Sequence, residues 1–213
     1  MGKLLTIIFA TTLSLMVAGS SFAAEAYEEY EPLTAPLSHP ADKVEVIEFF
    51  WYGCPHCYDF EPHINAWAAK KPANALFTQI PAIFSPKWEP HARAFYAAQM
   101  LNLMGRFHHA LFSAIHKQKR KIYTESAILD FVAELGMDEQ AFKDAMHSFA
   151  VETKIRRSKQ LVKASGIQGV PAVIVNGKYR TSGSLAGSYP RMVGIIDELV
   201  AEELALLPQP SKP

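Results

Sequence analysis

Residues 48–57 read Glu-Phe-Phe-Trp-Tyr-Gly-Cys-Pro-His-Cys, and this stretch decides the fold of the chain. It begins inside the apolar run Val44–Phe50, whose length and β-branched and aromatic content predict a buried parallel strand. Gly53 interrupts the run, and a helical pattern follows from Cys54 to about Lys70 before Pro72 ends it. The stretch is therefore interpreted as a strand, a short turn and the start of a helix that carries two cysteines.

The spacing of the two cysteines predicts different chemistry for each. In the first turn of a helix, residues i and i+3 lie close enough to form a disulfide. Cys54 would stand at the helix N-terminus, where unpaired backbone N–H groups and the positive end of the helix dipole favour a thiolate. Cys57 would lie one turn inside, more buried and less reactive. We therefore predict that Cys54 is the nucleophile and that Cys57 closes the disulfide.

The two residues between the cysteines suit the same chemistry. Pro55 fits an early helical position, because its missing N–H is no loss there. His56 can direct a hydrogen bond or a positive charge toward the Cys54 sulfur. A stabilised thiolate favours the reduced protein, and this makes the disulfide form an oxidant.

Other roles for the cysteine pair fit the sequence less well. The chain has 2 cysteines, whereas a structural zinc site needs four ligands, so no metal is expected. A c-type haem site requires His directly after the second cysteine, where this chain has Tyr58. A structural disulfide stabilises most when it closes a long loop, and this pair closes almost none. Redox chemistry by the cysteines explains the pair best, and it requires no cofactor.

Residues 1–23 have the pattern of a signal peptide. Lys3 precedes an apolar run from Leu4 to Ala18, and small residues at Ser21 and Ala23 form a cleavage pattern. The run is short for a transmembrane helix, so cleavage after residue 23 is expected, with an uncleaved membrane anchor as the alternative. Loss of Lys3 leaves 20 Lys and Arg against 21 Asp and Glu. This balance gives no electrostatic reason to expect nucleic-acid binding.

The rest of the chain divides into three parts. Residues 24–84 hold a proline-rich leader, the cysteine stretch and a second strand at 76–83. Residues 85–165 carry apolar residues at helical spacing, which predicts an inserted helical domain. Within it, Thr124 and Asp138 are predicted N-caps, the second of a long helix ending before Gly166. Residues 166–213 are predicted to form a strand at 172–175, an Asn-Gly hairpin with its return strand, and an amphipathic helix at 188–207.

Two motifs together resemble the DsbA family of periplasmic thiol:disulfide oxidoreductases, which belongs to the thioredoxin superfamily. The first is the stretch Glu48–Cys57, and the second is Gly169-Val170-Pro171-Ala172 followed by Val175-Asn176-Gly177-Lys178-Tyr179. The motifs lie over a hundred residues apart with a helical block between them. The resemblance implies an α/β thioredoxin fold with an inserted all-helical domain.

The resemblance also implies roles for particular residues. The Val170–Pro171 peptide bond is expected in cis, beside the active-site disulfide, with Val170 presenting backbone groups to an extended substrate. Glu48 is expected as a buried acid below the cysteines that assists proton transfer at Cys57. Some relatives pair this acid with a basic residue in the second strand, where this chain offers Gln79.

His63, His108, His109 and His116 are interpreted as exposed or partly packed structural residues.

The function implied is the transfer of the Cys54–Cys57 disulfide to newly exported, unfolded proteins in the periplasm. A DsbB-like membrane quinone reductase is the expected partner for reoxidation, and a monomer is expected. A disulfide isomerase or reductase is the nearest alternative, although isomerases of this kind usually bring a dimerisation domain. The glutathione-dependent branch of the fold lacks the full cysteine pair that this chain has. A holdase that binds unfolded chains without catalysis is the non-enzymatic alternative.

Overall fold

The computed structural model describes residues 29–208, and the predicted signal peptide lies outside them. Five strands form one sheet: β1 (Glu31–Pro32), β2 (Val44–Phe50), β3 (Ala75–Pro81), β4 (Ala172–Val175) and β5 (Tyr179–Ser182). Their order across the sheet is β1-β5-β4-β2-β3. β2 pairs in parallel with β3, and the β2–β4, β4–β5 and β1–β5 pairs are antiparallel. The strand bearing the cysteine stretch is therefore flanked by strands from both halves of the chain.

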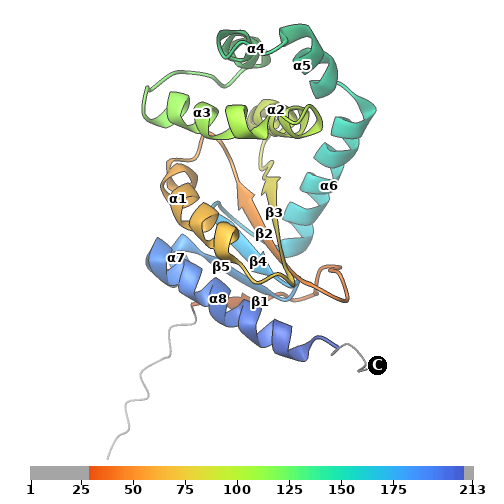
Figure 1. The fold of residues 1–213 in the computed structure, drawn as a ribbon, viewed down its shortest axis with the longest axis vertical. Helices are drawn as coiled ribbons and strands as arrows, with labels where there is room; N and C mark the ends of the chain where they lie inside the picture. The colour runs from red at the N-terminus through yellow and green to blue at the C-terminus, as the bar shows by residue number, and fades with distance from the viewer. Residues whose placement is uncertain (1–28, 209–213) are drawn as a thin grey trace, which may run out of the picture.

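Helices cover both faces of this sheet (Figure 1). On one face, α1 (Pro55–Lys70) and α8 (Tyr189–Leu206) pack on Val46 and Val173. On the other face, Ile47 and Ile174 meet the end of α6 (Phe149–Ser165). The alternation of β2 side chains between the two faces follows from the period of two in a strand. Within residues 29–208, no helix has the length and apolarity needed to cross a membrane.

A helical layer stands at the end of the sheet where β2 finishes (Figure 1). The chain enters it through the short 3-10 helix η1 (Pro86–Trp88) and continues through the α-helices to α6. The core of this layer includes Phe95, Phe107 and Phe112, and it reaches Phe50, Tyr52 and both cysteines without interruption. The cysteine pair therefore lies at the junction of the sheet and the helical layer. The helices before α6 are α2 (Glu89–Met100), α3 (Met104–His116), α4 (Glu125–Glu134) and α5 (Glu139–Met146).

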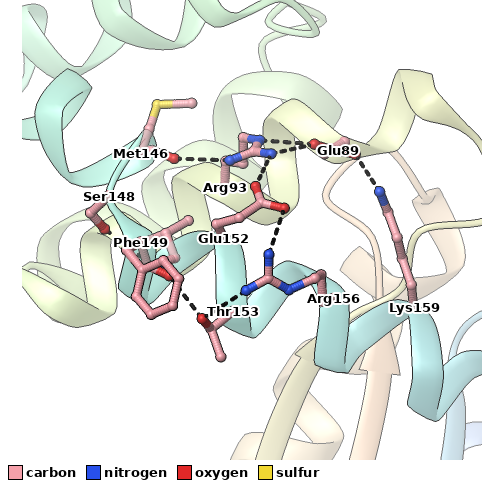
Figure 2. A network of polar contacts seen from close by, with 10 residues as sticks. Glu89, Arg93, Met146, Ser148, Phe149, Glu152, Thr153, Arg156 and Lys159 are labelled. Carbon is pink, nitrogen blue, oxygen red and sulfur yellow. Dashed lines mark hydrogen bonds and ion pairs between the residues drawn. The ribbon is translucent and has the colours of Figure 1, made fainter.

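Ion pairs connect α2 to α6, and a hydrogen bond connects α2 to α5 (Figure 2). The Arg93 guanidinium donates to Glu89 at 2.6 Å, to Glu152 of α6 at 2.7 Å, and to the backbone oxygen of Met146 at 3.2 Å. Lys159 of α6 reaches back to Glu89 at 2.7 Å. This network fixes α6, the helix that leads the chain from the helical layer back to the sheet.

Two predicted elements differ from the structure. Residues 138–165 form two helices, because the Ser148 side chain accepts a hydrogen bond from Val151 N–H and starts a new helix. The second strand ends at Pro81, two residues early. The chain also forms α7 (Gly183–Ala186), which the sequence pattern did not reveal.

Other predictions are confirmed. The side chains of Thr124 and Asp138 cap α4 and α5. Asn176 and Gly177 form the turn between β4 and β5, with φ values of 48° and 64°. The amphipathic C-terminal helix is α8, capped by the Ser188 side chain.

Candidate active site

Cys54 lies at the boundary between strand and helix. It is the N-cap of α1, with φ −90° and ψ 116°, and its backbone N–H donates to Trp51 O at 3.0 Å. Pro55 follows as the first helical residue. Cys54 is 9% exposed and Cys57 is 1% exposed, and both are thiols in this structure. The predicted difference in burial between the two cysteines is therefore present.

The two thiols have opposite pKa shifts. A hydrogen bond from the Cys57 side chain is the largest influence that lowers the Cys54 pKa, which falls to about 6. The backbone N–H groups of Cys57 and His56 and the His56 charge lower this pKa further, whereas burial raises it. Burial raises the Cys57 pKa well above its ordinary value, and the bond to Cys54 raises it further. At neutral pH, Cys54 is consequently the anionic sulfur and Cys57 the protonated one.

The second motif faces the first across the site. The Val170–Pro171 peptide bond is cis, as the resemblance implies. The Cys54 sulfur lies 3.4 Å from Val170 O, although the two residues are 116 positions apart, and Cys54 donates a hydrogen bond to this oxygen when it is protonated. Backbone groups of this loop therefore stand directly beside the reactive sulfur.

A cavity of about 870 Å³ opens next to this loop. His56 is exposed and stands at its edge, where its ring lies 3.3 Å from the Tyr189 hydroxyl. The cavity is large enough for several residues of an extended peptide. Its wall combines the cis-proline loop with backbone and hydroxyl groups from the end of β5 and the segment after it, among them Ser182, Gly183, Ser184 and Ser188.

Glu48 lies inside the sheet with a neutral partner. It is 2% exposed, and its carboxylate accepts a hydrogen bond from the Gln79 amide at 2.9 Å. The two residues are register partners in the parallel β2–β3 pair. The Glu48 pKa is raised to about 7, mainly by burial. The hydrogen bond from Gln79 opposes this rise, and the charge of Glu61 adds to it. The sequence prediction of a buried acid with Gln79 in place of a basic partner describes this arrangement correctly.

A second buried acid was missed. Glu61 is 5% exposed and occupies α1 four residues after Cys57, on the same helix face. Its carboxylate lies 3.3 Å from the exposed His109 ring and 3.9 Å from the His108 ring. Burial raises the Glu61 pKa, and the bond to His109 opposes that rise. The spacing of four residues from Cys57 could have shown that Glu61 lies on the same helix face as that cysteine. The contacts with His108 and His109 could not have been found in this way, because they depend on how α3 packs.

The prediction that His108 is exposed or partly packed is wrong. His108 is 8% exposed, and its Nδ1 lies 2.7 Å from the Tyr52 hydroxyl. Tyr52 is fully buried, and Trp51 stacks on Trp88 with ring centroids 4.1 Å apart. Aromatic packing therefore encloses the segment that precedes Cys54.

The fold and the site together define a class of protein. A five-stranded mixed sheet with a reactive Cys-x-x-Cys at a helix start, opposite a cis-proline, is the arrangement of a thioredoxin-fold thiol–disulfide oxidoreductase. The family model of the DSBA-like thioredoxin domain matches residues 45–189, and the chain belongs to this family.

Named relatives agree with this assignment. The chain is 43% identical to the thiol:disulfide interchange protein DsbA of Burkholderia cepacia, over 95% of this chain and 97% of that protein. It is 37% identical to the protein of the same name from Pseudomonas aeruginosa PAO1, over 95% and 96%. The crystal structure of Pseudomonas aeruginosa DsbA matches with a TM-score of 0.80 at 38% identity, covering 84% of this chain and 94% of that one. The oxidoreductase DsbA from Xylella fastidiosa matches with a TM-score of 0.76 at 30% identity, covering 83% and 96%.

Proposed function

We propose that the oxidised protein donates its Cys54–Cys57 disulfide to reduced, unfolded proteins newly exported to the periplasm. The observation that carries this proposal is the position of Cys54 at the start of α1, within reach of the Cys57 thiol and of helix N–H groups. Opening the disulfide releases Cys54 as an anion, and these donors stabilise that anion. Because the reduced state gains this stabilisation, the protein acts as an oxidant.

The transfer takes place in two exchange steps. A substrate thiolate attacks the Cys54 sulfur, a mixed disulfide forms, and Cys57 leaves and takes up a proton. A second substrate thiolate then attacks the substrate sulfur of that mixed disulfide and releases Cys54 as a thiolate. Two electrons pass from the substrate to the two cysteines, and no other cofactor takes part.

Glu48 serves as the proton donor and acceptor for Cys57 in this proposal. Its pKa of about 7 leaves both protonation states populated at neutral pH, which suits general acid–base work. The Glu48 charge is one of the influences that raise the Cys57 pKa, so the two groups are close enough to interact. Gln79 orients the carboxyl group without adding a charge.

Val170 and Pro171 hold the substrate in this proposal. Backbone groups of the cis-proline loop bind an extended segment as an added strand, and the adjoining cavity receives the flanking residues. His56 stands at the cavity edge and contributes charge near the Cys54 sulfur. Pro55 keeps the first turn of α1 free of an unpaired N–H.

The proposed setting is the periplasm, to which residues 1–23 direct the chain as a signal peptide that is then cleaved. A DsbB-like membrane quinone reductase reoxidises the cysteine pair there, and the protein works as a monomer. The two relatives named above are called thiol:disulfide interchange proteins, and this supports a redox role for the cysteine pair.

Two measurements test the proposal. The equilibrium constant of the Cys54–Cys57 pair against glutathione should be strongly oxidising, and a strongly reducing value would reject the oxidant role. The oxidised protein should restore activity to a reduced, unfolded ribonuclease, and Cys54→Ser should abolish this. If Cys54→Ser retained the full effect by suppressing aggregation, the protein would be a holdase instead.

A further inference from the structure

Two histidines of α3 hold Tyr52, two residues before Cys54. The Tyr52 hydroxyl meets His108 Nδ1 at 2.7 Å, and the Tyr52 backbone oxygen accepts from His116 Nε2 at 2.7 Å. The histidines are eight residues apart, so they lie on one helix face, with Phe112 between them. The Phe112 ring packs against the Tyr52 ring at 4.8 Å. One face of α3 therefore fixes Tyr52 at its side chain and at its backbone.

His116 also contacts the chain on the far side of the cysteine pair. Its ring stacks on Tyr58 with centroids 5.2 Å apart and an interplanar angle of 19°. Tyr58 directly follows Cys57, and its backbone N–H donates to Cys54 O at 3.2 Å. His116 thus bridges the residue two before Cys54 and the residue one after Cys57.

This bridge bears on the geometry of the reactive sulfur. The turn Trp51–Cys54 is closed by the bond from Cys54 N–H to Trp51 O, and the Tyr52 carbonyl lies within that turn. Cys54 has extended, non-helical dihedrals, so helix hydrogen bonding alone does not fix its position. A buried carbonyl that loses its donor tends to seek another partner, which would let the turn relax.

We infer that His116 is a positioning residue for disulfide exchange, holding the turn that places the Cys54 sulfur at the start of α1. The inference rests on Cys54 being the reactive thiol, as proposed above. Through His116, the helix α3 of the helical layer would help to set the geometry of the redox site. No proton transfer or substrate contact is assigned to His116.

The experiment compares substitutions of His116 by residues of similar size that either keep or lack an N–H donor for the Tyr52 carbonyl. His116→Gln keeps an N–H that can reach the Tyr52 carbonyl, whereas His116→Met removes it, and both lose the ring. His116→Phe keeps a ring on Tyr58 without the donor. His147→Phe, which removes an exposed contact to Glu125, is the control. The readouts are the equilibrium constant with glutathione and the pH profile of Cys54 alkylation by iodoacetamide, each on folded protein.

In His116→Met and His116→Phe, which lack the donor, the equilibrium constant with glutathione should be about fivefold less oxidising than in wild type. The pH profile of alkylation should give Cys54 a higher apparent pKa in both variants. His116→Gln and His147→Phe should stay within about twofold of wild type. The inference is overturned if His116→Met or His116→Phe leaves both readouts unchanged, or if His116→Gln shifts them as far as His116→Met does. A wild-type Cys54 that does not alkylate at neutral pH would instead reject the proposed function.

Discussion

Glu48 makes the stability of the protein depend on pH in a defined direction. Burial raises its pKa from 4.5 to about 7, so between these values the folded protein binds a proton that the unfolded chain releases. Stability from this group is therefore complete at acidic pH and is lost as the pH rises through 7. Glu48→Gln should remove this dependence, and its unfolding free energy relative to wild type should rise by about 3 kcal/mol across that interval.

Urea denaturation at several pH values measures this difference. Glu45→Gln is the matched control, because it removes a carboxylate from the same strand that instead contacts Thr78. A constant difference between Glu48→Gln and wild type from pH 4.5 to 7 would show that the buried carboxyl group does not titrate there.

Gly53 and Gly105 form a contrasting pair for substitution by alanine. A Cβ at Gly53 would lie 2.4 Å from the Trp51 ring, so Trp51 would have to leave its stack on Trp88. Gly53→Ala should destabilise the protein by about 1–3 kcal/mol and weaken the near-ultraviolet circular dichroism of the tryptophans. At Gly105, in the first turn of α3, nothing lies within 4 Å, and alanine should stabilise by about 0.5 kcal/mol. Equal effects at both positions would contradict the packing at Trp51.

Single residues were predictable where the local sequence determines their surroundings. Cys54, Pro55 and Cys57 could be placed because the boundary between strand and helix is encoded within a few residues. Glu48 could be placed because the resemblance to the DsbA family implies a buried acid there; the strand pattern alone does not single it out, since the half-buried Glu45 is a charge in the same strand. The contacts of His116 and His108 could not be predicted, because they depend on the angle at which α3 crosses the end of the sheet.

At the scale of elements, Arg93 is expected to determine how firmly α6 is held. It is mostly buried and bonds to α2, α5 and α6 together (Figure 2). Arg93→Met should lower the unfolding free energy by about 2 kcal/mol, because two carboxylates and a carbonyl lose a charged donor. Arg120→Met, which breaks the more exposed pair with Glu134, should have a much smaller effect than Arg93→Met. Urea denaturation compares the two, and an equal cost would contradict a special role for Arg93.

Helix limits were predictable where a cap or turn residue is strongly biased, and less so elsewhere. Asp138 and Asn176 occupy the positions expected for a helix cap and a hairpin turn. Ser148 also caps a helix, but it stands inside a continuous helical pattern, and a serine is common enough in helices to be overlooked. The four-residue helix α7 is too short for any periodicity to reveal.

At the scale of the whole molecule, the reduced and oxidised forms should differ in stability in a pH-dependent way. Folding lowers the Cys54 pKa from 9.0 to about 6, so the reduced form gains stability that is complete above pH 9 and lost as the pH falls through 6. The oxidised form has no thiol to titrate. The urea midpoint of the reduced form should therefore rise relative to that of the oxidised form from pH 6 to 9.

Parallel midpoints for the two forms over that range would contradict the assignment of the low pKa to Cys54. Cys57 opposes this rise only near pH 9, where its thiol ionises in the unfolded chain but stays protonated in the folded protein. Reduced Cys54→Ser provides the control, since it lacks the titrating thiol while keeping the fold.

The sheet order places β2 between β3, which follows it closely, and β4, which lies over a hundred residues later. A ribosome makes the chain from its N-terminus, so the cysteine pair is synthesised long before the cis-proline loop. A nascent chain that stops within α6 already has both sulfurs but lacks the strand that closes the sheet beside them. The cysteine pair and the proposed substrate-binding loop therefore come together only once nearly all of the chain has been made.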